Sequence, residues 1–356
     1  MRHVWLLALG LSFAVGCSPD PLTLDQRVEM MVYQSEKLQN EIYELNRRIA
    51  ELSPEGSGTA VPQHSPTRLA AESDDPFRAT SISLHRATGG TDSDGKVGDD
   101  GNGRALREAF VKDGVDVRWL VADPAGRTAQ TVIAVDPSGS RVIYSLGGTA
   151  LLESADEFAA DILDGAAALY VGEAFFDVAR RAMQEARNLG AQVVYGPGGM
   201  ASWIGMENLA ELMRLADFVL ASRAELRAMT GRDEPDAGAQ LLLEWGVPGV
   251  VATLGEQGAA CYSRRPEQNA GPAWAPSFSV DVVDTTGAGD AFASGFISSL
   301  VEGRPTAECL SRGNACAAMA IGRVGAREAV PTREELEMFL AARGGVELRG
   351  RDGAES

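Results

Sequence analysis

The stretch DTTGAGDAFASGF, at residues 284–296, joins a glycine-rich loop directly to an apolar run. Gly287 and Gly289 allow a tight turn that leaves backbone N–H groups free. From Ala291 to Ile297 the chain continues with apolar residues at helical spacing, so the stretch predicts a loop that leads into a helix. The N-terminus of such a helix attracts anions, because its N–H groups are unpaired and carry partial positive charge.

Asp290 stands where the loop meets the predicted helix, and two roles are open for it. In the first, Asp290 or Asp284 caps the helix by accepting hydrogen bonds from first-turn N–H groups. In the second, Asp290 accepts a proton from a substrate hydroxyl while the N–H groups hold the negative charge of a phosphoryl group in transfer. Capping accounts for one aspartate but not for the glycine-rich approach, which favours the second role.

Upstream of this stretch, short apolar runs alternate with helix-length segments. Residues 129–135 and 141–144 are predicted to form a hairpin, with Pro137 and Gly139 in its turn. This alternation predicts an α/β fold with a largely parallel, doubly wound sheet, in which ligands bind at the carboxyl ends of the strands. The other predicted strands are residues 167–172, 191–196, 216–222 and 247–255, and helices are expected at 175–189 and 237–245.

The composition narrows the classes of function. A formal net charge of -18, with 50 acidic and 32 basic residues, argues against a nucleic-acid partner and favours a small-molecule ligand. All three histidines precede the residues expected to fold, so a His-based triad or metal site is excluded there, and carboxylates are expected to carry the chemistry. Cys261, Cys309 and Cys316 lack CxxC spacing and are predicted to be buried thiols.

Residues 284–296 resemble the second signature of the PfkB, or ribokinase-like, carbohydrate kinases. The resemblance extends over residues 95–342 and implies a ribokinase-like fold with a small β lid. It also implies ATP-dependent phosphoryl transfer to a sugar or nucleoside hydroxyl, with Mg²⁺ as a further cofactor. Similar segments are GKVGDDGNGRALREAFVKDGVDV (95–117), SRAELRAMTG (222–231), VVATLGEQGAACY (250–262), GNACAAMAIGRVGA (313–326) and PTREEL (331–336).

The resemblance implies roles for individual residues. Asp290 matches the general base that deprotonates the acceptor hydroxyl, and Glu225 matches an acid that organises Mg²⁺ and phosphate through water. The implied anion hole is the backbone of Gly287, Ala288 and Gly289, and the implied nucleotide site comprises Thr253, Gly255, Gly258 and Asn314.

Three features depart from the family pattern. Ser222 stands where Asn is usual, and Gly196 stands where Asp is common, which removes a polar group near the phosphate side of the site. The first strand and the GG segment of the family are not found before Gly95. Without that strand, an apolar edge of the sheet would be exposed and sugar hydroxyls would lose partners.

The front of the chain has a different character. Residues 1–17 end in AVGC, which resembles a bacterial lipobox and predicts lipidation at Cys17; a misassigned start or a chance apolar run is the alternative. Residues 22–53 have the spacing of a short coiled coil, or of one amphipathic helix on another surface. Residues 54–94 are expected to form a disordered linker, and residues 343–356 a flexible tail.

We therefore expect an ATP-dependent carbohydrate kinase, cytoplasmic if it is active, with homo-oligomer formation left open. The alternative is a membrane-tethered, catalytically weak or inactive kinase-like module anchored through Cys17, because an exported protein would meet little ATP.

Overall fold

The computed structural model describes residues 82–86, 91–135, 141–145, 148–149, 151–198, 206–264 and 272–344. The predicted signal segment, the coiled-coil helix and the tail beyond residue 344 lie outside these residues, as does the predicted lipidation site at Cys17. Among the described residues, no helix is both long and apolar enough to cross a bilayer. The described chain divides into two units: a hairpin within residues 132–146 forms the smaller unit, and the larger unit holds the rest.

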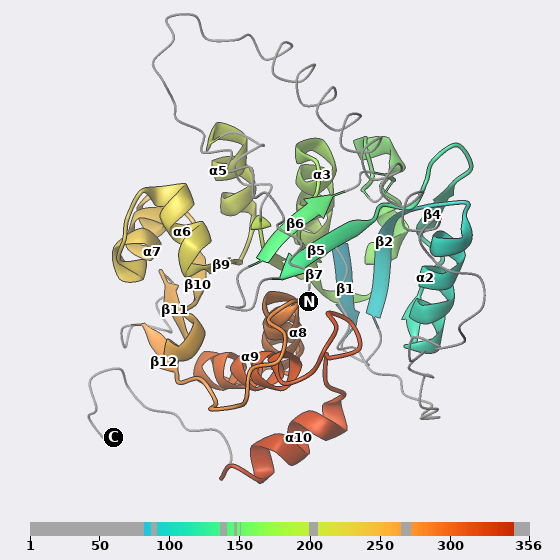
Figure 1. The fold of residues 1–356 in the computed structure, drawn as a ribbon. Helices are drawn as coiled ribbons and strands as arrows, with labels where there is room; N and C mark the ends of the chain where they lie inside the picture. Colours follow the sequence, from blue (N-terminus) through green and yellow to red (C-terminus); the bar gives the residue numbers. More distant parts are fainter. Residues whose placement is uncertain are drawn as a thin grey trace, which may run out of the picture. The chain divides into compact units, whose positions relative to one another are not determined.

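The larger unit is built on one mixed sheet of ten strands (Figure 1). The predicted parallel strands are confirmed: β7 (Ala166–Val171), β8 (Gln192–Tyr195), β9 (Phe218–Ser222) and β10 (Gly249–Thr253) pair in parallel in that order. Two antiparallel strands extend the β10 side, namely β11 (Ala259–Ser263) and β12 (Ala273–Ala275). On the β7 side lie β1 (Ile82–Arg86), β2 (Thr91–Gly98), β3 (Val115–Asp116) and β4 (Leu120–Asp123).

Strands β1 and β2 correct the prediction for the front of the domain. The sequence predicts a disordered linker up to residue 94, yet residues 82–86 and 91–94 lie in the sheet. β1 runs antiparallel to both of its neighbours, with Leu84 opposite Leu169 of β7 and Asp92 of β2. His85, expected to precede the folded residues, also lies in β1. Because both edges of this short strand are hydrogen-bonded, the sheet is continuous between β7 and β2 and the expected open edge is not formed.

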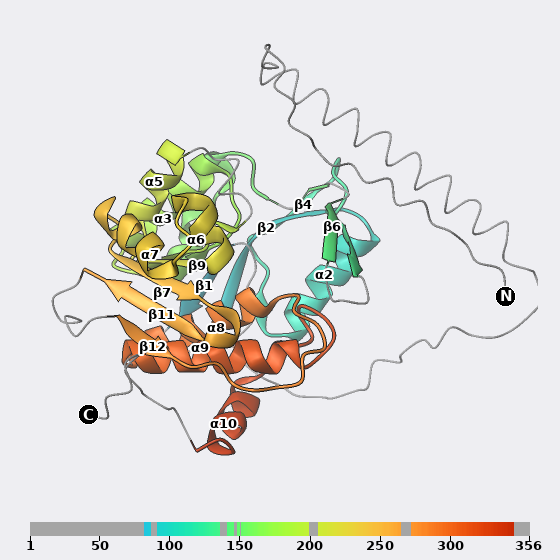
Figure 2. The same ribbon diagram turned by 60° about the vertical axis from the view of Figure 1, so that its left-hand side comes forward.

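Helices cover both faces of the sheet, as a doubly wound fold requires (Figures 1 and 2). The helices α8 (Ala288–Val301) and α9 (Thr306–Ile321) pack on one face, where Phe218 of β9 meets Phe296 edge-on at 5.7 Å between ring centroids. The other face is covered by α3 (Phe176–Asn188), α5 (Met206–Leu215), α6 (Arg223–Thr230) and α7 (Pro235–Glu244). The three cysteines predicted to be buried thiols are buried.

Asp100 fixes the start of α2 (Gly101–Lys112), the helix that follows β2. Its carboxylate accepts hydrogen bonds from the backbone N–H of Gly103 at 2.8 Å, and from the backbone N–H and hydroxyl of Thr128 at 2.9 and 2.7 Å. These hydrogen bonds lower the pKa of Asp100 to about 2. One carboxylate thus caps a helix and ties it to the segment before the hairpin.

The smaller unit contains the predicted hairpin. Its strands are β5 (Thr131–Val135) and β6 (Arg141–Ser145), which form a two-stranded sheet. The runs AQTVIAV and RVIY, on either side of DPSGS, therefore pair as their β-branched composition predicts.

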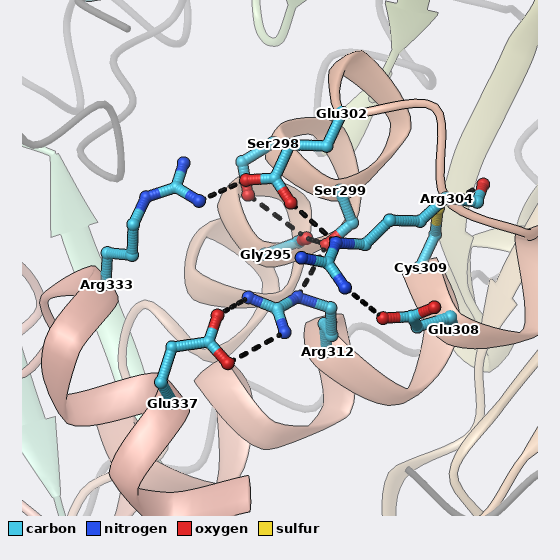
Figure 3. Close-up of polar contacts among 10 residues, drawn as sticks. All are labelled: Gly295, Ser298, Ser299, Glu302, Arg304, Glu308, Cys309, Arg312, Arg333 and Glu337. Atoms are coloured by element: carbon cyan, nitrogen blue, oxygen red, sulfur yellow. Dashed lines mark hydrogen bonds and ion pairs between the residues drawn. The ribbon is translucent and has the colours of Figure 1, made fainter. Parts of the chain in front are cut away.

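A buried arginine ties the C-terminal helix α10 (Arg333–Ala341) to α8 and α9 (Figure 3). Arg312 is 2% exposed, and its guanidinium pairs with the Glu337 carboxylate and donates to the Ser299 hydroxyl at 3.1 Å. Beside it, Glu302 accepts hydrogen bonds from Arg333 and Arg304. Burial alone would raise the pKa of Glu302, but these two arginines outweigh burial and lower it.

Candidate functional site

The loop before α8 turns through a glycine that no other residue could replace without strain. Gly287 has φ +77°, and a Cβ placed on it would lie 2.9 Å from the carbonyl oxygen of Ala326. α8 begins at Ala288, directly after this turn, and no side chain caps it. The predicted loop and helix are therefore present. No side chain occupies the first-turn N–H groups of α8, and the Ala288 N–H makes only a long contact of 3.4 Å to the Thr285 carbonyl oxygen, so the turn can bind an anion.

Neither aspartate of the motif acts as the helix cap. The Asp284 carboxylate accepts hydrogen bonds from the backbone N–H groups of Thr286 at 2.9 Å and Gly325 at 3.2 Å, both outside α8. The Asp290 side chain makes no hydrogen bond to any residue that the structure describes, and it is exposed. The capping interpretation is thus not supported, and Asp290 remains accessible to a substrate.

The surroundings of Asp290 favour its protonated form. Desolvation by the surrounding protein raises the pKa of this carboxyl, and the negative charges of Glu173 and Glu225 raise it further. A base with a raised pKa is better matched to accepting a proton near neutral pH.

Glu225, predicted to organise metal and phosphate, lies in the first turn of α6. It forms a capping box with Ser222: the backbone N–H of Ser222 donates to Glu225 Oε2 at 2.7 Å, and the backbone N–H of Glu225 donates to the Ser222 hydroxyl at 3.2 Å. Ser222 therefore serves as the N-cap in place of the usual Asn. This pairing fixes the Glu225 carboxylate at the carboxyl end of β9.

Glu173 belongs to the site although no sequence motif marks it. It follows β7 and carries one of the two charges that act on Asp290. Its position directly after a buried parallel strand is a usable signal, since ligands bind at the carboxyl ends of such strands.

The predicted nucleotide-side residues gather around the turn between β10 and β11. Gly258 has φ +85°, and a Cβ placed on it would lie 2.0 Å from the carbonyl oxygen of Ala275 in β12. The buried Asn314 of α9 donates to the carbonyl oxygens of Ala275 and Pro276, at 3.0 Å each. Thr253 ends β10, and Gly255, at φ +62°, has open space around it. The structure thus brings Gly258 and Asn314 together through Ala275.

The carboxylates near Asp290 have the chemistry that Mg²⁺ prefers. Glu173, Glu225 and Asp290 carry carboxylate oxygens, but no group of three acidic, His or Cys residues in the described ranges could by itself hold a metal ion. Mg²⁺ usually keeps several waters and binds to one or two carboxylates together with phosphate oxygens. The donor set therefore fits an ion that arrives with a nucleotide.

Comparison with known proteins identifies the family of this chain. The model of the pfkB family carbohydrate kinases matches residues 81–333. Fructokinase-1 of Zea mays is 31% identical over 281 residues, covering 73% of this chain and 85% of the relative. The ATP-dependent ribose-1-phosphate kinase of Halopiger xanaduensis is 30% identical over 249 residues, covering 70% of this chain and 80% of the relative.

A solved structure agrees with the sequence matches. The crystal structure of ribokinase from Thermotoga maritima superposes with a TM-score of 0.61 at 25% identity, covering 70% of this chain and 81% of that one. The family model begins at residue 81, directly before β1, which agrees with the presence of a strand where the composition predicts a linker. Because the family model spans more than half of this chain, the chain belongs to the PfkB family of carbohydrate kinases.

Proposed function

We propose that this protein transfers the γ-phosphoryl group of ATP to a hydroxyl of a sugar or nucleoside, with Asp290 as the general base. The observation that carries the proposal is the position of Asp290: its exposed carboxylate lies in the first turn of α8, beside uncapped N–H groups, and its pKa is raised. The names of the relatives, a fructokinase and an ATP-dependent ribose-1-phosphate kinase, support ATP as donor and a sugar as acceptor.

In this proposal the residues of the loop have two roles: Asp290 removes a proton, and backbone N–H groups stabilise negative charge. Asp290 accepts the proton as the acceptor oxygen attacks phosphorus, so that the alcohol becomes a nucleophile without releasing a free alkoxide. The N–H groups of Gly287, Ala288 and Gly289 hold the negative charge on the phosphoryl oxygens. A positioned base contributes about a hundredfold to ten-thousandfold to the rate, and positioning of the two substrates supplies much of the remainder.

The turn after β10 is the proposed nucleotide side of the site. Thr253, Gly255 and Gly258 form the turn on which the nucleotide rests, and Asn314 supports that turn through Ala275. Glu225, with Glu173 beside it, would hold a water-coordinated Mg²⁺, which when bound neutralises phosphate charge. The carboxylates themselves repel free phosphate, so they favour a nucleotide that carries its cation.

The direct test is phosphoryl transfer by the purified full-length chain. ADP release is measured with ATP and Mg²⁺ against a panel that includes fructose, ribose, ribose 1-phosphate and nucleosides. We expect one acceptor to stimulate ADP release well above the acceptor-free rate, and Asp290→Asn to abolish that stimulation. Equal rates with and without every acceptor, or full activity in the Asp290→Asn variant, would refute the proposal.

A further inference from the structure

Gly196 and Tyr170 lie at the carboxyl ends of two neighbouring strands, β8 and β7. A Cβ placed on Gly196 would lie 2.6 Å from the Tyr170 hydroxyl oxygen and 3.3 Å from two of its ring carbons. Any side chain at position 196 would therefore displace that hydroxyl. The glycine removes one polar group from the site, but it also makes room for another one, supplied from β7.

The ring and the hydroxyl of Tyr170 have different surroundings. The ring packs in the apolar cluster that includes Phe292 and Phe296 of α8, so its position is fixed by the helix that carries Asp290. The residue is only 7% exposed, and its hydroxyl makes no hydrogen bond to any residue that the structure describes. The hydroxyl is not among the buried side-chain atoms that lack a partner in the described residues, so a ligand or water can reach it and take the hydrogen bond.

Tyr170 carries its proton at neutral pH. Burial raises the pKa of the phenol, and the charges of Asp290, Glu225 and Glu173 raise it further. The hydroxyl is therefore a neutral hydrogen-bond donor close to the same three carboxylates that surround the proposed reaction site.

A second glycine repeats the arrangement. Gly198 has φ +54°, and a Cβ placed on it would lie 3.1 Å from Glu173 Oε1. The backbone after β8 thus leaves space, at two alternate positions, for two polar side chains that follow or end β7. Both side chains interact electrostatically with Asp290: the Glu173 charge raises the pKa of Asp290, and the Asp290 charge raises the pKa of Tyr170.

We propose that the Tyr170 hydroxyl donates a hydrogen bond to an oxygen of the phosphoryl group that is transferred, an inference that rests on the proposed function. None of the three carboxylates accepts a hydrogen bond from Tyr170 among the described residues, so the donor is free for a ligand. An anionic oxygen is its best partner, because hydrogen bonds to charged groups are about twice as strong as neutral ones. Of the two substrates, the nucleotide is the one that brings such oxygens to the N-terminus of α8.

The experiment compares two nucleotides that differ in the γ-phosphoryl group. Binding of ADP and of a non-hydrolysable ATP analogue, both with Mg²⁺, is measured by calorimetry for the full-length protein and for Tyr170→Phe, which keeps the ring in its cluster. We expect the analogue to bind about tenfold more weakly in the variant, and ADP to bind within about twofold of its original affinity. With an acceptor present, kcat should fall by about tenfold to a hundredfold.

Two further variants separate this role from a structural one. Tyr195→Phe is the matched control, because Tyr195 is also buried, on the adjacent strand, but faces the opposite cluster; it should leave both affinities and kcat unchanged. Gly196→Ala keeps the Tyr170 hydroxyl but displaces it, so it should weaken the analogue selectively. In the Tyr170→Phe background it should weaken the analogue much less, because only the 3.3 Å contacts with the ring remain.

The binding measurements do not need turnover, so they stand apart from the proposed function. Absence of phosphoryl transfer together with a selective loss of analogue affinity in Tyr170→Phe would refute the kinase proposal and support this inference. Equal losses for ADP and the analogue, or no loss for either, would overturn the inference even in an active kinase.

Discussion

The carboxylate of Asp284 accepts a hydrogen bond from the backbone N–H of Gly325, 41 residues further along the chain and 3.2 Å away. A second hydrogen bond, from the N–H of Thr286, makes Asp284 a link between the loop before α8 and the segment after α9. Asp290, six residues later, has no such hydrogen bond within the described residues. The two aspartates of one motif are therefore expected to respond differently to the same substitution.

Asp290→Asn is expected to lower kcat by about a hundredfold to ten-thousandfold, since it removes a positioned base. Affinity for the ATP analogue should change by less than about threefold, because the lost group acts on the acceptor and not on the nucleotide. The melting temperature should stay equal or rise, since burial penalises the native carboxylate. Steady-state kinetics, calorimetry and thermal unfolding measure the three quantities.

Asp284→Asn provides the matched comparison. It weakens two acceptor interactions that hold the loop, so we expect a stability loss of about 1 kcal/mol with kcat reduced far less than in Asp290→Asn. A larger catalytic loss in Asp284→Asn than in Asp290→Asn would contradict the assignment of the base.

The raised pKa of Asp290 predicts the direction of a pH effect. The base works when deprotonated, so kcat/KM should fall on acidification. The midpoint of this fall should lie above the pKa of an ordinary aspartate. Desolvation by the surrounding protein is the leading cause of the shift, and the charges of Glu173 and Glu225 add to it. Glu173→Gln removes one of these charges and should move the acid limb of the pH–rate profile toward lower pH. If the acid limb in this variant stayed at the same pH or moved to higher pH, Glu173 would not act on the base.

The sequence predicts those elements whose signal lies within a short stretch of consecutive residues. The parallel strands β7 to β10 are short apolar runs, and the loop before α8 is marked by glycines at the required positions. β1 escapes prediction because the alternation of Ile82 and Leu84 with polar residues is too short to stand out in a stretch rich in Ser, Thr and Asp. Its place depends on hydrogen bonds to β7 and β2. Pairing with distant strands overrides the local composition.

The candidate site shows the same limit. Asp290 and Glu225 lie in recognisable local motifs, but Glu173 and the proposed donor Tyr170 lie at the end of β7, which carries no motif. Gly196 reads as the loss of a polar group because its relation to Tyr170 exists only in three dimensions. The sequence shows that position 196 lacks a polar side chain, but only the fold shows that the Tyr170 hydroxyl lies in the space beside it.

Glu225 has two possible contributions that one substitution separates. Glu225→Gln retains an oxygen that can accept the Ser222 N–H, so the capping box and the melting temperature should be nearly preserved. The lost charge should raise the Mg²⁺ concentration that gives half-maximal activity by about tenfold or more. Glu225→Ala should in addition destabilise α6 by about 1 kcal/mol. An unchanged Mg²⁺ requirement in Glu225→Gln would restrict this residue to capping.

The turn between β10 and β11 offers two glycines with positive φ but different surroundings. Gly255→Ala has open space and should cost only the conformational strain, about 1 kcal/mol. Gly258→Ala would bring its Cβ to 2.0 Å from the Ala275 carbonyl oxygen and must displace β12, so it should cost at least about 2 kcal/mol more. Urea unfolding measures both. Equal losses of stability in the two variants would mean that β12 moves away from the turn at no cost in free energy.

The arginine network around α10 predicts a loss of stability in acid. Hydrogen bonding and pairing with Arg312 lower the pKa of Glu337. Burial raises the pKa of Glu302, but its contacts with Arg333 and Arg304 outweigh burial and lower it. For Glu335, the hydrogen bond from the Thr332 backbone N–H and the contact with Arg323 outweigh burial in the same way. Carboxyls whose pKa is lower in the folded state stabilise it above their unfolded pKa, about 4.3, and this contribution is lost as pH falls through the folded values.

Glu337→Gln tests this pH dependence, because it leaves the buried Arg312 without its counter-charge. Since Glu337 is itself 51% exposed, we expect a loss of about 1–2 kcal/mol at pH 7. The difference from the original protein should shrink as the pH falls through the lowered pKa of Glu337, because the native glutamate then becomes protonated too. Glu334→Gln, at an exposed position of the same helix, should change stability by less than about 0.5 kcal/mol at either pH. Urea unfolding at pH 7 and pH 3 measures both variants: a deficit in Glu337→Gln of the same size at both values would show that its charge does not stabilise the network.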